Sequence, residues 1–217
     1  MELSFPRPHV QDTVARHFDD AAKVLVRTAQ KCTPAITTAA DLIASALAAK
    51  RKLMICGNGG SAADCQHLAA EFTSRLSADF QRPGLAALAL TTDTSFITAY
   101  TNDFDFNGIF ARQVQALGQP DDVLLCISTS GRSANVLRAA RQALDMGLRV
   151  VALTGVAPAS DTGRGSAPHL TDIADIAICI PSDHTQHVQE AHLAVEHMLC
   201  HCVERQLFGE HGAGDWS

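Results

Sequence analysis

Residues 56–72 read CGNGGSAADCQHLAAEF, and this stretch decides the fold. We expect a strand to end at Cys56, a glycine turn to follow, and a helix to begin near Ser61. A helix N-terminus after such a turn exposes unpaired backbone N–H groups, which can bind an anion. Gly59 and Gly60 permit positive φ and a close ligand approach. The alternative is a plain strand-to-helix turn without a ligand, but its position at the carboxyl end of a strand favours binding.

Outward from this segment, short apolar runs alternate with helical patterns. Five runs predict buried strands: Leu53–Cys56, Leu85–Leu90, Val123–Ile127, Arg149–Leu153 and Ile176–Ile180. Alternating strands and helices predict an α/β fold with a parallel sheet and helices on both faces.

The length of 217 residues fits one domain with additional helices. Before the sheet we expect two helices, near Val10–Lys31 and Pro34–Ala49, and after it a helix near His187–Phe208. Residues 156–171 are rich in Gly, Pro, Ser and Thr and predict a loop. The predicted division is N-terminal helices at about 10–50, an α/β core at about 52–207 and a loose tail at 209–217.

Composition narrows the class of protein. The net charge of −6 argues against a basic nucleic-acid footprint, so we expect no nucleic-acid partner. Charged residues make up only 18%, which suggests surface buried between subunits. The seven cysteines include no CxxC pair and several lie in apolar runs, as expected in a reducing cytosol. No signal peptide or membrane-spanning run is evident, so a cytoplasmic protein without a membrane partner is expected.

A second polar segment, ISTSGRSANV, occupies residues 127–136. It follows a predicted strand and precedes a predicted helix. Its four hydroxyl residues suit the several acceptor oxygens of a phosphate: Ser128, Thr129, Ser130 and Ser133. The alternative is that these hydroxyls only cap the helix, but four in six residues favour a phosphate site.

Two pairs of residues could carry metal or acid–base chemistry. His67 and Glu71 lie four apart on one helix face, so they could bind one ion, exchange protons, or form an ordinary surface contact. Gln189 and His197 lie eight apart, about 12 Å along an ideal helix. Either the metal ligands come from two subunits, or the helix begins irregularly at Gln189. Spacing alone does not favour His197 over His192.

Five segments carry a family resemblance: CGNGGSAADCQHLAAEFTSR at 56–75, TNDFDFNGIF at 101–110, DVLLCISTSGRSANV at 122–136, VALTG at 151–155 and QEAHLAVEHML at 189–199. In their order and spacing, the chain resembles the phosphoheptose isomerase family of the sugar isomerase (SIS) class over roughly residues 10–207. The resemblance implies a five-stranded, flavodoxin-like SIS domain, assembled as a homotetramer with active sites at subunit interfaces.

The resemblance also implies roles for individual residues. The zinc ligands would be His67, Glu71, Gln189 and His197, with Glu71 as base and His197 as acid. The substrate contacts would be Asn58, Gly59, Gly60, Ser61, Glu71, Asp93, Thr94, Ser128, Thr129, Ser130, Ser133 and Gln189, with Arg75 and Asp103 nearby. The implied reaction converts sedoheptulose 7-phosphate to D-glycero-D-manno-heptose 7-phosphate through an enediol, for surface heptose such as that of lipopolysaccharide.

Some residues depart from the family pattern. Arg132 stands where Asn is usual, Ala62 and Ala63 replace bulkier neighbours, and His187 stands where Arg is usual. Two alternatives remain: a non-enzymatic scaffold like the SIS protein that binds the bacterial replication initiator, and an isomerase or sensor of another phosphosugar. The scaffold group typically lacks the equivalents of Glu71 and His197, so their presence favours the enzyme.

Overall fold

The computed structural model describes residues 10–156, 168–210 and 212. Its helices are α1 (Val10–Ala48), α2 (Gly60–Thr73), α3 (Thr94–Asp103), α4 (Ile109–Leu117), α5 (Ala134–Asp145) and α6 (Thr185–Phe208), with short 3₁₀ turns η1 (Phe106–Gly108) and η3 (Leu170–Asp172). Its strands are β1 (Leu53–Gly57), β2 (Ala87–Ala89), β3 (Val123–Ser128), β4 (Arg149–Gly155) and β5 (Ile176–Ile180).

The five strands form one parallel sheet in the order β2-β1-β3-β4-β5. This is the flavodoxin-like order, so the predicted fold class is confirmed. Strand β2 is shorter than the predicted run Leu85–Leu90. At its start, the backbone N–H of Leu85 donates to the carbonyl of Phe72 in α2, 3.0 Å away, and therefore does not extend the ladder.

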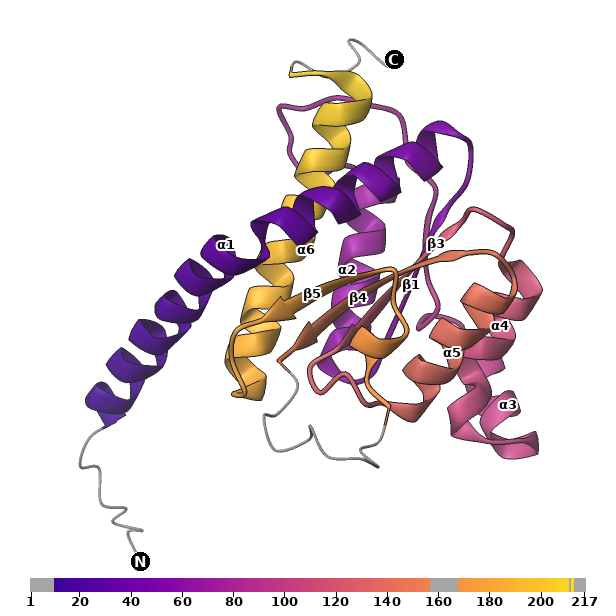
Figure 1. Cartoon of the computed structure of the whole chain (residues 1–217), viewed down its shortest axis with the longest axis horizontal. Coiled ribbons are helices and arrows are strands. Elements are labelled where there is room, and N and C mark those ends of the chain that lie inside the picture. Colours follow the sequence, from indigo (N-terminus) through magenta and orange to yellow (C-terminus); the bar gives the residue numbers. More distant parts are fainter. Residues whose placement is uncertain (1–9, 157–167, 211, 213–217) are drawn as a thin grey trace, which may run out of the picture.

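Alternating strand residues form two cores, one on each face of the sheet. Figure 1 shows α1, α2 and α6 on one side of the sheet and α4 and α5 on the other. Ile55 and Leu125 pack with buried residues of α1, α2 and α6. Met54 and Leu124 pack on the other face with α4 and α5. The strands are buried on both faces, as a doubly wound sheet requires.

The start of the chain corrects one prediction. The two helices expected to end at Lys31 and begin again at Pro34 are one continuous helix, α1, which contains Pro34. A proline inside a helix costs about 3 kcal/mol. Here both halves of α1 are held by tertiary packing, since Val24 before the proline and Ile43 after it are buried in the same core. Packing therefore overrides the local breaking signal.

Parts of two predicted segments fall outside the described residues. The predicted loop at 156–171 is described only at its two ends, and its far end enters η3 at Leu170. Of the predicted tail, only residues 209, 210 and 212 are described. Among the described residues, no helix is both long and apolar enough to cross a membrane.

Candidate active site

The glycine turn (Gly57–Gly60) and the segment Ser128–Ser133, which we call the Ser/Thr loop, lie side by side at the carboxyl ends of the strands. The end of β1 pairs with the end of β3, with Gly57 opposite Ile127. The turn after β1 and the loop after β3 therefore flank the point where the strand order reverses. In open α/β sheets, ligands bind in the crevice at this switch point.

A pair of amides joins the two loops. The Asn58 side chain donates to the Asn135 Oδ1 atom, and Asn135 donates back to Asn58 Oδ1, both at 2.8 Å. Asn135 is buried in the first turn of α5. The local sequence gives no sign of this role for Asn135, because its partner lies 77 residues away.

Gly59 precedes α2 with φ of 56° and Ser133 precedes α5, and neither residue caps its helix with a side chain. Within α5, the Asn135 side chain accepts from the Val136 N–H at 2.9 Å. The N–H groups at the start of α2 and those of α5 before Val136 are therefore available to an anion. The Ser128 and Ser133 hydroxyls lie 3.1 Å apart, and Ser61 is buried in the first turn of α2. The alternative that the Ser133 hydroxyl serves only as a helix cap does not agree with this geometry.

His169 holds the Ser/Thr loop through its backbone. Its Nε2 atom lies 3.1 Å from the carbonyl oxygen of Ser130, which can only accept, so this nitrogen donates. The neighbouring Leu170 N–H donates to the carbonyl of Gly131 at 2.9 Å. Gly131 has φ of 65°, and a Cβ atom there would lie 2.0 Å from His169 Nε2. His169 sits inside a predicted loop, where periodicity carries no information about its partner.

Helices α2 and α6 bring three of the predicted site residues together. The Nε2 atoms of His67 and His197 lie 2.9 Å apart, and their rings meet edge to face. His67 Nε2 lies 3.8 Å from Glu71 Oε1. His192, which spacing alone could not separate from His197, is completely buried on another face of α6. Of these two histidines, only His197 contacts the His67 side chain.

Gln189 lies nearer the start of both helices. Its Nε2 atom is 3.4 Å from Asp64 Oδ2, and its side chain fills the space where a Cβ atom of Gly60 would be. Burial raises the pKa of Asp64, although the Gln189 hydrogen bond and His67 oppose the change. Since α6 is regular from Thr185, the alternative of an irregular helix start at Gln189 is not observed. Within one chain, Gln189 and His197 therefore lie about two turns apart.

The His67, His197 and Glu71 groups suit a zinc ion chemically. Zinc takes imidazole nitrogen at 2.0–2.1 Å in tetrahedral sites, which places two bound nitrogens about 3.3 Å apart. The observed separation of 2.9 Å needs only a small widening. The Glu71 carboxylate, 3.8 Å from His67 Nε2, would complete a mixed nitrogen and oxygen donor set that zinc accepts once its oxygen moves toward His197.

Arg82 fixes the end of α2 that carries Glu71. Its guanidinium donates to the carbonyl oxygens of Glu71 at 2.6 Å and Phe72 at 2.7 Å. Its Nε atom lies 2.7 Å from Glu204 Oε1, and both side chains are buried. A cation at a helix C-terminus is electrostatically favourable. Nothing in the local sequence pattern pointed to Arg82.

The remaining predicted residues lie around this edge or on the surface. Asp93 accepts from the Phe96 N–H at 2.8 Å and so caps α3, whose first residue is Thr94. Both are exposed, as is Arg75. Asp103 accepts from the Asn102 side chain at 2.9 Å at the far end of α3.

Comparison with known proteins identifies the family of this chain. A SIS domain model matches residues 16–155. The phosphoheptose isomerase of Methylibium petroleiphilum is 45% identical over 93% of this chain and 96% of its own length. That of Thiobacillus denitrificans is 46% identical over 92% of this chain and 98% of its own. The chain belongs to the phosphoheptose isomerase family.

Solved phosphoheptose isomerases have the same fold. The Neisseria gonorrhoeae structure matches with a TM-score of 0.79 at 38% identity, covering 89% of this chain and 98% of its own. The Francisella tularensis structure matches with a TM-score of 0.80 at 37% identity, covering 90% and 98%. These findings confirm the predicted family and the prediction that the chain is an enzyme, an aldose–ketose isomerase acting on a sugar phosphate.

Proposed function

We propose that this chain converts sedoheptulose 7-phosphate to D-glycero-D-manno-heptose 7-phosphate. The observation that carries the proposal is that α2, whose N-terminus follows the glycine turn, also carries His67 and Glu71, with His197 in contact with His67. One part of this arrangement suits a phosphate and the other suits proton transfer. The relatives, at about 45% identity over nearly the whole chain, are named phosphoheptose isomerase, which supports a heptose phosphate as the substrate.

The phosphate end of the substrate would bind at the Ser/Thr loop. The contacts are backbone N–H groups and the hydroxyls of Ser128, Thr129, Ser130 and Ser133, with Ser61 and the Gly59–Gly60 turn on the adjoining loop. Arg132 adds a positive charge to this loop. Binding at a group remote from the reacting carbons holds C1 and C2 in one orientation, which lowers the entropic part of the barrier.

Proton transfer is assigned to Glu71 and His197. The reaction moves one proton between C1 and C2 while the carbonyl oxygen and the neighbouring hydroxyl exchange their protonation. Glu71, whose side chain is 19% exposed, takes the proton from carbon and returns it to the adjacent carbon. His197 supplies and removes protons at the oxygens. His67, in contact with both groups, holds them together.

Zinc would be held by His67, Glu71 and His197, with Gln189 as the fourth protein ligand. When bound, it supplies Lewis-acid stabilisation of the negative charge that develops on the substrate oxygens. Because Gln189 lies two turns from His197 on a regular helix, we propose that Gln189 joins the other ligands from a neighbouring subunit.

A homotetramer is the proposed assembly. The single chain leaves large apolar side chains uncovered at the N-terminal half of α1 and beyond α3: Val10, Val14, Phe18, Phe104 and Phe106. Val10, Val14 and Phe18 recur every four residues along α1, and an exposed apolar stripe of this kind usually marks an interface. The low content of charged residues agrees with it. We further propose a cytoplasmic enzyme whose product enters surface heptose, such as that of lipopolysaccharide.

The direct test is to incubate the purified chain with sedoheptulose 7-phosphate and follow the aldose by NMR. Conversion is expected with the heptulose phosphate and not with an amino-sugar phosphate. If only the amino-sugar phosphate reacts, the substrate assignment is wrong while the isomerase class stands.

A further inference from the structure

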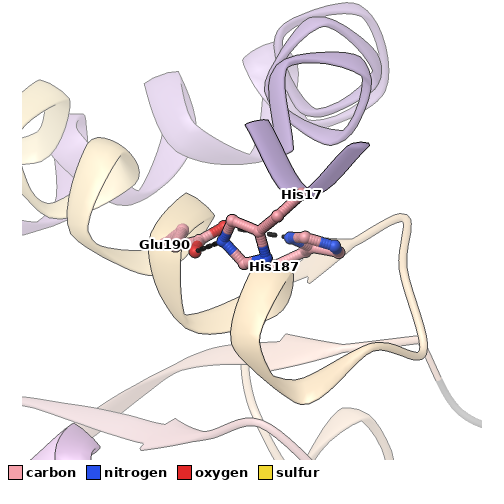
Figure 2. A group of neighbouring side chains, drawn as sticks. All are labelled: His17, His187 and Glu190. Atoms are coloured by element: carbon pink, nitrogen blue, oxygen red, sulfur yellow. Dashed lines mark hydrogen bonds and ion pairs between the residues drawn. The ribbon is translucent and has the colours of Figure 1, made fainter. Parts of the chain in front are cut away.

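A second group of metal-binding side chains lies away from the candidate active site. His17 of α1 and His187 and Glu190 of α6 converge, and Figure 2 shows both rings turned toward the carboxylate. His17 Nε2 lies 2.7 Å from Glu190 Oε1, and His187 Nδ1 lies 3.0 Å from Glu190 Oε2. The two imidazole rings are 4.7 Å apart between centroids. We call these residues the α1–α6 cluster.

The spacing of the donor atoms fits one ion. One atom from each residue lies within 4.8 Å of the other two, so small side-chain movements would bring all three to bonding distance of one ion. Two imidazole nitrogens and one carboxylate oxygen are ligands of zinc and related transition metals, whereas magnesium and calcium prefer oxygen alone. His187 is nearly buried, while the side chains of His17 and Glu190 are about two-fifths exposed. Water can therefore fill the remaining positions.

The cluster is distinct from the proposed active site. Glu190 follows Gln189 directly, and successive residues on a helix point about 100° apart. Gln189 therefore faces Asp64 on α2, whereas Glu190 faces His17 on α1. A metal ion bound at one group would not displace the ligands of the other.

Nearby charges do not prevent binding of a cation. A surface hollow beside the cluster is lined by Asp20, Lys23 and Arg27 of α1 and by residues 181–184. Lys23 is paired with Asp19 at 2.6 Å and with Asp20 at 3.3 Å, so its charge is balanced locally. The ligand carboxylate itself contributes one negative charge.

We propose that His17, His187 and Glu190 bind a divalent transition-metal ion of the zinc class at a second site on this chain. The ion links residues that are 173 positions apart, on the exposed N-terminal half of α1 and the start of α6. It would fasten α1 to the helix that presents Gln189. This site goes beyond the proposed isomerase function, and it does not depend on zinc binding in the active site.

The test measures zinc bound by the full-length chain after dialysis against zinc alone. The variants are His17→Gln and His187→Gln, and the control is His201→Gln, an exposed histidine of α6 outside the cluster. Each cluster variant is expected to bind one equivalent per chain less than the wild type, while the control binds the same as the wild type. This difference in bound zinc between variant and wild type is expected whether the wild type binds two zinc equivalents per chain or only one.

Location is tested by anomalous diffraction at the zinc edge, with a peak expected between His17, His187 and Glu190. Adding zinc should also raise the melting temperature of the wild type and of His201→Gln by several degrees more than that of His17→Gln. Equal zinc content in His17→Gln and His201→Gln, or no anomalous peak at the cluster, would overturn the proposal. Loss of zinc only in Glu71→Gln would assign all binding to the active site and overturn it as well.

Discussion

Glu196 carries a prediction about stability that the structure makes quantitative. Its side chain is completely buried in α6, and neither carboxylate oxygen has a hydrogen-bond partner among the described residues. Burial, with a smaller contribution from the nearby Asp64 charge, raises its pKa from 4.5 to about 9. The folded chain therefore keeps this carboxyl group protonated at neutral pH.

The sign of the effect follows from proton counting. Between pH 4.5 and about 9 the folded state holds a proton on Glu196 that the unfolded state has released, so stability falls as pH rises. The total is on the order of 6 kcal/mol, or about 1.4 kcal/mol for each pH unit. This stability is fully present below pH 4.5 and is lost by about pH 9.

His192 opposes Glu196 over part of this range. Burial lowers the pKa of His192 from 6.5 to about 4, although a contact with the Thr154 backbone partly offsets the change. Between pH 4 and 6.5 the unfolded state therefore binds the extra proton, and stability rises with pH. The two effects nearly cancel up to pH 6.5. Above it only the Glu196 effect remains, so between pH 6.5 and 8.5 the folded state should lose about 3 kcal/mol.

The assay is urea unfolding at pH 6.5, 7.5 and 8.5, at one protein concentration because oligomers unfold in a concentration-dependent way. The comparison is Glu196→Gln, which keeps the shape but cannot titrate. The variant should lose much less stability over this interval than the wild type. If the two proteins lose stability equally between pH 6.5 and 8.5, Glu196 is not the group responsible and the reasoning fails.

Three further predictions address the site and its supports. Glu71→Gln and His197→Asn should each lower turnover at least about a hundredfold while the chain remains folded, measured with zinc content checked in each variant; normal turnover by a zinc-loaded Glu71→Gln protein would remove Glu71 from the mechanism. Gly131→Ala should raise the KM for the phosphosugar more than it lowers kcat, because a side chain there needs positive φ and meets His169; an unchanged KM would mean that the loop tolerates the distortion. Arg82→Met should lower the free energy of unfolding by about 3–5 kcal/mol, measured by urea unfolding, because Glu204 is left buried without its partner. Adding Glu204→Leu should restore much of this loss. If the double variant is no more stable, the main role of Arg82 is its hydrogen bonds to the α2 carbonyl groups.

Local signals predicted much of this fold and one part of the site. The strand, glycine turn and helix of residues 53–73 are encoded by neighbours in the sequence, and so is the Ser/Thr loop. Rules that depend on neighbours failed where packing dominated, since Pro34 lies within a continuous helix. Local sequence rules also could not identify His169 or Arg82. These side chains act by donating hydrogen bonds to the carbonyl oxygens of Ser130 and Glu71, and only the tertiary fold brings those groups near.

The contact between His67 and His197 also could not be predicted from local sequence patterns. His67 was predicted from its spacing to Glu71, and His197 from the family resemblance. Their contact across 130 residues depends on α2 and α6 running side by side. Contacts at Gln189 near the start of both helices and at Glu204 near the end show that the two helices run in the same direction. Spacing within α6 could not reveal which of its histidines faces α2.

The paired amides of Asn58 and Asn135 have a consequence for protein engineering. Because each side chain both donates to and accepts from the other, neither can be exchanged alone without leaving an amide group unmatched. The glycine turn and the Ser/Thr loop should therefore be transplanted or randomised as one cassette. A specificity library that varies one loop and keeps the other as a fixed background would sample mostly broken combinations.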